Sequence, residues 1–122
     1  MAQILIIDDD PAIGDILKRI LSKEGHSVES VTDGQEGVDL LNGHDFDLAI
    51  VDIFMPQKSG LEIIQEVNRG SKDVKLLAMT AFDALDDIDM REFAERYGAV
   101  GSFEKPFAHQ DVITKVAEAL DD

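Results

Sequence analysis

The chain has 122 residues, 44% hydrophobic and 30% charged, a balance typical of one folded globular domain rather than a disordered chain. Its formal net charge of −15 disfavours direct binding to nucleic acid or anionic membranes and favours cations and basic partner surfaces. The absence of cysteine excludes disulfides and thiolate chemistry, and no apolar run approaches the roughly 18 residues of a membrane span. We expect a single cytoplasmic domain over residues 1–122.

Short apolar runs alternate with helical patterns along the whole chain. Runs of this length, bounded by polar residues, predict buried parallel strands, and apolar residues at helical spacing fill the segments between them. The expected strands are 4–7, 27–32, 48–51, 74–79 and 100–103, and the expected helices are 11–24, 35–41, 61–69, 83–97 and 112–120. This alternation predicts right-handed crossovers and a doubly wound α/β sandwich, with one parallel sheet in the strand order 2-1-3-4-5.

Five polar side chains stand where these apolar runs end: Asp8, Asp9, Asp52, Thr80 and Lys105. Because ligands of open α/β sheets bind outside the carboxyl ends of the strands, we expect these side chains to gather at one sheet edge. Packed carboxylates raise one another's pKa unless a cation lies among them. Mg²⁺ takes oxygen ligands and shares phosphate oxygens, so the sequence predicts Mg²⁺ and a phosphoryl group here.

Asp52 is the candidate nucleophile of this set. A carboxylate can accept a phosphoryl group as an aspartyl phosphate. A metal ion and Lys105 would neutralise charge on the phosphoryl oxygens, and Thr80 would donate a hydrogen bond to one of them. A lone lysine or threonine at a strand end is more commonly a surface or structural residue, so the hypothesis depends on the joint arrangement.

With these residues in place, the chain resembles a response-regulator receiver domain of the CheY-like family over residues 3–120. The motifs that carry the resemblance are 7–11 (IDDDP), 52–60 (DIFMPQKSG), 79–81 (MTA) and 104–107 (EKPF). The resemblance implies a flavodoxin-like (βα)5 fold and a role in two-component signalling. It implies that Asp52 takes a phosphoryl group from a phosphohistidine on a histidine kinase or histidine phosphotransfer protein, which switches binding to a downstream protein target. Such a domain is not a turnover enzyme, because it catalyses only its own phosphorylation and dephosphorylation.

The resemblance also assigns roles to individual residues. It implies Mg²⁺ held by Asp9, Asp52 and the backbone carbonyl of Phe54, with Asp8 binding directly or through water. Thr80 would be the switch hydroxyl and Lys105 would pair with the phosphoryl group. The Lys105–Pro106 peptide bond would be cis.

The chain departs from the family pattern at one position. Receivers usually carry an aromatic residue three positions before the lysine of strand five, and here that position is Ser102, with Phe103 next to it. By strand alternation Phe103 should face the opposite side of the sheet. We therefore expect phosphorylation to act through shifts around Thr80 and residues 83–97.

A second hypothesis concerns two aromatic residues near the ends of the expected strands. Phe54 and Phe82 stand two residues beyond Asp52 and Thr80. Either ring could cover the phosphoryl group against attacking water, or could simply pack against a loop.

Other functions remain open at this point. A Mg²⁺-dependent phosphatase would need a second acid at position 54, which is Phe. A flavodoxin-like electron carrier would need a phosphate-binding loop after the first strand, where this chain has aspartates that would repel the phosphate. The remaining alternatives are a receiver excised from a longer transcription regulator or hybrid kinase, and a phosphate-independent interaction domain.

Overall fold

The computed structural model describes residues 2–55, 58–70, 73–81 and 90–121. Strands and helices alternate along these residues. They are β1 (Gln3–Ile7), α1 (Pro11–Lys23), β2 (Ser27–Val31), α2 (Gly34–Gly43), β3 (Leu48–Asp52), α3 (Gly60–Arg69), β4 (Lys75–Ala81), α4 (Met90–Tyr97), β5 (Gly101–Lys105) and α5 (His109–Leu120).

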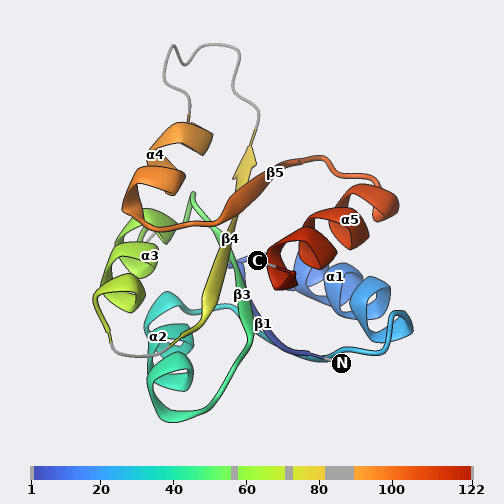
Figure 1. The fold of residues 1–122 in the computed structure, drawn as a ribbon, viewed down its shortest axis with the longest axis horizontal. Helices are drawn as coiled ribbons and strands as arrows, with labels where there is room; N and C mark the ends of the chain where they lie inside the picture. Colours follow the sequence, from blue (N-terminus) through green and yellow to red (C-terminus); the bar gives the residue numbers. More distant parts are fainter. Residues whose placement is uncertain (1, 56–57, 71–72, 82–89, 122) are drawn as a thin grey trace.

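The strands form one parallel sheet in the order β2-β1-β3-β4-β5, as predicted. The register pairs Ile7 of β1 with Val51 of β3, and Asp52 with Met79 of β4. All carboxyl ends therefore lie at one edge of the sheet, and β5 is an edge strand paired only with β4. Figure 1 shows α1 and α5 covering one face of the sheet and α2, α3 and α4 covering the other.

Two apolar cores hold these layers together. Alternate residues of the central strands point to opposite faces, so Ile4 and Ile6 join the core under α1 and α5, whereas Leu5 and Ile7 join the core under α2 and α3. These four side chains are fully buried, and burying each contributes roughly 1.5–3 kcal/mol. Burial on both faces explains why the strands have continuous apolar sequences.

Local signals in the sequence set the helix ends. Asp10 caps α1 by accepting a hydrogen bond from the Ala12 amide at 2.9 Å, and Pro11 is the first helical residue. Ser59 caps α3 through the Glu62 amide at 3.2 Å. Gly25 follows α1 with φ of +92°, a conformation that side chains disfavour, as expected for a helix stop.

The structure corrects two expected boundaries. Strand β4 continues through Thr80 to Ala81, and β5 includes Lys105, because their pairing extends to Ala81 opposite Lys105. The expected helix over 83–97 is described only from Met90, and the segment 82–89 lies outside the described residues. Among the described helices, none combines the length and the apolarity needed to cross a bilayer.

Candidate functional site

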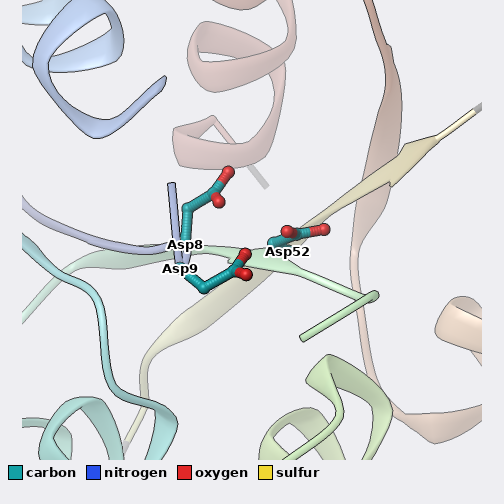
Figure 2. A group of neighbouring side chains, drawn as sticks. All are labelled: Asp8, Asp9 and Asp52. Carbon is teal, nitrogen blue, oxygen red and sulfur yellow. The ribbon is translucent and has the colours of Figure 1, made fainter. Parts of the chain in front are cut away.

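Three carboxylates meet at the carboxyl ends of β1 and β3. One ligand oxygen from each of Asp8, Asp9 and Asp52 can be chosen so that all lie within 4.8 Å of one another. Figure 2 shows Asp8 and Asp9 following β1, with Asp52 beside them at the end of β3. Asp8 and Asp52 are buried, whereas Asp9 is exposed. The expected gathering of these acids is therefore present.

Asp8 organises the turn from β1 into α1. Its backbone amide donates to the Val31 carbonyl at 3.1 Å, which extends the β1–β2 pairing by one residue. Its Oδ1 accepts the Asp10 amide at 2.9 Å. Asp8 Oδ2 is the single buried side-chain oxygen or nitrogen in the described residues that has no hydrogen bond. Its charge is instead met by the Lys105 ammonium, which lies 2.8 Å away.

Asp52 is the last residue of β3 and is 4% exposed. Its Oδ1 accepts the Phe54 amide at 3.1 Å, and its Oδ2 lies 3.2 Å from Lys105 Nζ. The following loop is fixed by two backbone hydrogen bonds, from the Ile53 amide to the Met79 carbonyl and from the Gly60 amide to the Ile53 carbonyl. Both carboxylate oxygens of Asp52 are thus oriented by neighbouring donors.

Lys105 reaches from the edge strand to both buried acids. Its Nζ lies 2.8 Å from Asp8 Oδ2 and 3.2 Å from Asp52 Oδ2. Lys105 and Asp8 therefore form an ion pair. Asp8 Oδ2 accepts no hydrogen bond, so this contact is not aligned as one. The Lys105–Pro106 peptide bond is cis, as the family resemblance implies.

Burial and charge shift the protonation of this cluster. Burial, reinforced by the nearby Asp8 carboxylate, raises the pKa of Asp52 from 3.8 to about 6, against the opposing effects of Lys105 and the Phe54 amide. Burial alone would lower the pKa of Lys105, but the carboxylates of Asp8 and Asp52 outweigh it, so this pKa is raised above 10.5. At neutral pH, Asp52 is mainly ionised and Lys105 is positively charged.

The donor set fits a divalent cation. Three aspartate side chains and one lysine gather at the sheet edge, so acidic groups outnumber basic ones there, and all available ligand atoms are oxygens. Oxygen-only ligand sets suit Mg²⁺ rather than softer metals. The pKa of Asp52 stays raised although Lys105 lies 3.2 Å away, because burial and the Asp8 carboxylate outweigh the lysine, and a divalent cation would offset that repulsion.

The other candidate residues lie around this cluster. Thr80 is buried on β4, one residue beyond Met79, the register partner of Asp52. Phe54 is 46% exposed, so its ring is not packed away in the core. Phe82, the second expected cover, lies outside the described residues.

Ser102 and Phe103 face opposite sides of the sheet, as predicted. Phe103 is buried in the core under α1 and α5, where its ring meets Phe107 edge to face at 5.6 Å. Ser102 pairs in register with Ala78, a residue of the opposite core. The prediction that Phe103 faces away from the Ser102 side is confirmed.

Lys58 was not among the sequence-based candidates. Its Nζ lies 2.6 Å from Glu66 Oε2 on α3 and 3.2 Å from Gln35 Oε1 on α2. It lines a hollow of about 580 Å³ that also borders Asp9 and Met55. No motif signals this arrangement, because the two partners of Lys58 come from separate helices, α2 and α3.

Comparison with known proteins identifies the family. The profile of the family described as the response regulator receiver domain matches residues 4–117. The chain belongs to the response regulator receiver domain family. Members of this family are receivers in two-component signalling rather than turnover enzymes.

Individual relatives agree with this assignment. The response regulator MprA of Mycolicibacterium vanbaalenii is 33% identical over 118 residues, covering 97% of this chain and 50% of MprA. The CheY-like receiver domain protein of Methanospirillum hungatei is 32% identical with a TM-score of 0.88, covering 99% of this chain and 94% of that one. The chemotaxis protein CheY4 of Vibrio cholerae is 25% identical with a TM-score of 0.88, covering 98% and 99%. This receiver therefore spans about half the length of the curated relatives it matches.

Proposed function

We propose that this receiver is a phosphorylation-operated switch whose acceptor is Asp52. One Asp52 carboxylate oxygen attacks the phosphorus of a partner's phosphohistidine, so an O–P bond forms, the P–N bond breaks, and the histidine ring leaves with the bonding electrons. The observation that carries the proposal is the contact of Lys105 Nζ with Asp52 Oδ2 at 3.2 Å inside the acidic cluster. A histidine kinase is the partner that the family implies in general; a histidine phosphotransfer protein and a downstream target are narrower proposals.

The residues around Asp52 supply complementary functions. Lys105 neutralises charge on the phosphoryl oxygens, and the Phe54 amide orients the acceptor carboxylate. The Thr80 hydroxyl donates a hydrogen bond to a phosphoryl oxygen. Asp8, Asp9, Asp52 and the backbone carbonyl of Phe54 hold Mg²⁺. When bound, this ion supplies positive charge to the phosphoryl oxygens and fixes their orientation.

Phosphorylation of Asp52 would change the structure mainly in one region of the domain. Because Ser102 replaces the usual aromatic and Phe103 packs in the opposite core, the change should centre on Thr80 and α4. Structures with and without beryllofluoride, a phosphoryl mimic, would test this, and the absence of a shift at Thr80 and α4 would contradict it.

The decisive experiment is intact mass measurement after incubation with acetyl phosphate, with and without Mg²⁺. The expected result is a Mg²⁺-dependent gain of one phosphoryl group that Asp52→Asn abolishes and that the exposed control Asp39→Asn retains. No gain in folded protein, together with no beryllofluoride binding, would instead support a phosphate-independent interaction domain. The expectations of a cytoplasmic location, of one domain over 1–122 and of an origin in a longer regulator or hybrid kinase stay predictions.

A further inference from the structure

The loop that follows Asp52 is anchored where it begins and where it ends. The Ile53 amide donates a hydrogen bond to the Met79 carbonyl at 3.0 Å, and the Gly60 amide donates to the Ile53 carbonyl at 2.9 Å. These two bonds fix the points where the chain leaves β3 and enters α3. Phe54 lies inside the loop, and the proposed function makes its backbone carbonyl a ligand of Mg²⁺. The position of that carbonyl therefore depends on what else holds the loop.

Lys58, near the end of this loop, links it to two helices. Its Nζ lies 2.6 Å from Glu66 Oε2 on α3 and donates a hydrogen bond to Gln35 Oε1 on α2 at 3.2 Å. Figure 1 shows α2 and α3 on the same face of the sheet. The side chains of Lys58 and Glu66 are 22% and 47% exposed, and ion pairs of such exposure add little to stability. The bridge therefore constrains the position of the loop more than it stabilises the fold.

The start of α2 packs directly against the same loop. A Cβ added at Gly34 would lie 3.3 Å from Lys58 Cβ and 3.4 Å from Met55 Cε. A side chain at position 34 would press on both residues, so the glycine lets α2 approach the loop closely. Asp9 borders the same hollow of about 580 Å³ as Met55 and Lys58. The contacts of Lys58 therefore lie on the side of the loop that adjoins an expected metal ligand.

We infer that Lys58 is a positioning residue for the Mg²⁺ site of this receiver. Its contacts with Gln35 and Glu66 hold the loop against α2 and α3, and this sets the place of the Phe54 carbonyl relative to the acidic cluster. Residues outside a ligand set commonly tune metal affinity by orienting the ligands. The inference rests on the proposed function and extends it to a residue outside the proposed ligand set.

The positive charge of Lys58 offers a different explanation, which predicts an effect of opposite sign. If Lys58 acted on the ion through its charge alone, Lys58→Met would strengthen Mg²⁺ binding by removing repulsion, and Glu66→Gln would weaken it. If Lys58 acts through the position of the loop, both substitutions break the bridge and both weaken Mg²⁺ binding. These two variants together therefore separate positioning from charge.

The test titrates Mg²⁺ alone into the unphosphorylated ¹⁵N-labelled protein at fixed ionic strength, and the amide signals of the acidic cluster report binding by NMR. Lys58→Met and Glu66→Gln each break the bridge, and Lys58→Arg is the conservative variant that keeps a cationic donor between the two helices. The controls, Lys115→Met and Glu118→Gln, make the same charge changes in a pair on α5 whose charged atoms lie 3.9 Å apart.

Both bridge variants should bind Mg²⁺ more weakly. Lys58→Met and Glu66→Gln should each raise the Mg²⁺ dissociation constant roughly fivefold, less than the change of about tenfold or more that follows loss of a direct partner of a ligand. Lys58→Arg should stay within about twofold of the unaltered protein, because a charge-assisted donor remains. The α5 controls should also stay within about twofold, because their pair is exposed.

A second measurement separates positioning from general damage to the fold. The Mg²⁺ concentration that gives half of the maximal rate of phosphorylation by acetyl phosphate should rise in Lys58→Met by the same factor as the dissociation constant. The rate at saturating Mg²⁺ should stay within about twofold, because the acceptor and its other partners are unchanged. A fall in the saturated rate alone would contradict a positioning role toward Mg²⁺.

Several results would overturn the inference while leaving the proposed function intact. They are stronger Mg²⁺ binding by Lys58→Met, unchanged binding by either bridge variant, a Lys58→Arg variant as weak as Lys58→Met, and equal weakening in the α5 controls. In each case the unaltered protein still binds Mg²⁺ and still takes up a phosphoryl group. Absence of Mg²⁺ binding by the unaltered protein would instead overturn the proposed metal site and the role of Lys58 together.

Discussion

Lys105 Nζ lies closer to Asp8 Oδ2, at 2.8 Å, than to Asp52 Oδ2, at 3.2 Å. The lysine therefore bridges the ends of β1 and β3, and its charge compensates two buried carboxylates rather than one. Its position before phosphorylation depends on Asp8 as much as on the proposed acceptor.

Removing this bridge should destabilise the metal-free protein. Lys105→Met leaves Asp8 and Asp52 facing each other without a cation, and we expect a loss of roughly 2 kcal/mol in the free energy of unfolding at pH 7. The loss should shrink near pH 5, where Asp52 takes up a proton. Urea unfolding in EDTA measures this, with Lys115→Met as the exposed control. Equal losses in both variants would show that the bridge has no special role.

Metal-free stability should also fall with rising pH because of Asp52. Its pKa is 3.8 in the unfolded chain and about 6 in the fold, so between these values the folded state binds more protons. The free energy of unfolding should therefore decrease as pH rises from about 4 to about 6, by at most roughly 3 kcal/mol. Asp52→Asn should flatten this part of the profile, whereas Asp39→Asn should leave it unchanged. A profile equally steep in Asp52→Asn would refute the assignment to Asp52.

Mg²⁺ should stabilise the fold through Asp9. A ligand at a hundredfold excess over its dissociation constant adds about 2.7 kcal/mol of stability. Asp9→Asn should abolish most of the Mg²⁺-dependent rise in Tm, which circular dichroism can follow. Asp10→Asn is the matched neighbour, because asparagine also caps helices well and Asp10 contacts the Ala12 amide. A Mg²⁺ response lost equally in both variants would contradict the ligand role of Asp9.

The exposed ring of Phe54 should slow hydrolysis of the aspartyl phosphate. Its amide donates a hydrogen bond to Asp52 Oδ1 at 3.1 Å, and its side chain is exposed to solvent. Phe54→Asn should shorten the phosphorylated lifetime severalfold, because water would reach the phosphorus more easily. Mass measurement over time after removal of acetyl phosphate gives the rate, with Ile16→Asn as an exposed apolar control. An unchanged rate would show that the ring does not shield the site.

Gly60 should tolerate no side chain. A Cβ there would collide with the Asp52 carbonyl oxygen and lie 2.6 Å from Ile53 Cα, and neither backbone atom can move without disturbing the loop that follows Asp52. Gly60→Ala should cost about 3 kcal/mol of stability. Gly43→Ala, where a Cβ meets nothing within 4 Å, should be neutral or stabilise by up to about 1 kcal/mol. Comparable urea midpoints for the two variants would contradict this.

The sequence determined the elements and their order, because the signals for them are local. Apolar runs, the capping residues Asp10 and Ser59 and the stop at Gly25 each act within a few residues. The gathering of Asp8, Asp9 and Asp52 was also predictable, since the carboxyl ends of parallel strands share one edge.

Only the tertiary structure decided the features that depend on contacts between residues far apart in the sequence. Lys105 and Asp52 are 53 positions apart, and only packing sets which carboxylate the lysine approaches more closely. The tertiary structure also decided where β4 and β5 end. Both strands extend as far as Ala81 and Lys105 because these two residues pair with each other. Burial of Asp52, and with it the raised pKa, likewise arises only when the layers assemble, because desolvation is a property of the surrounding fold and not of the local sequence.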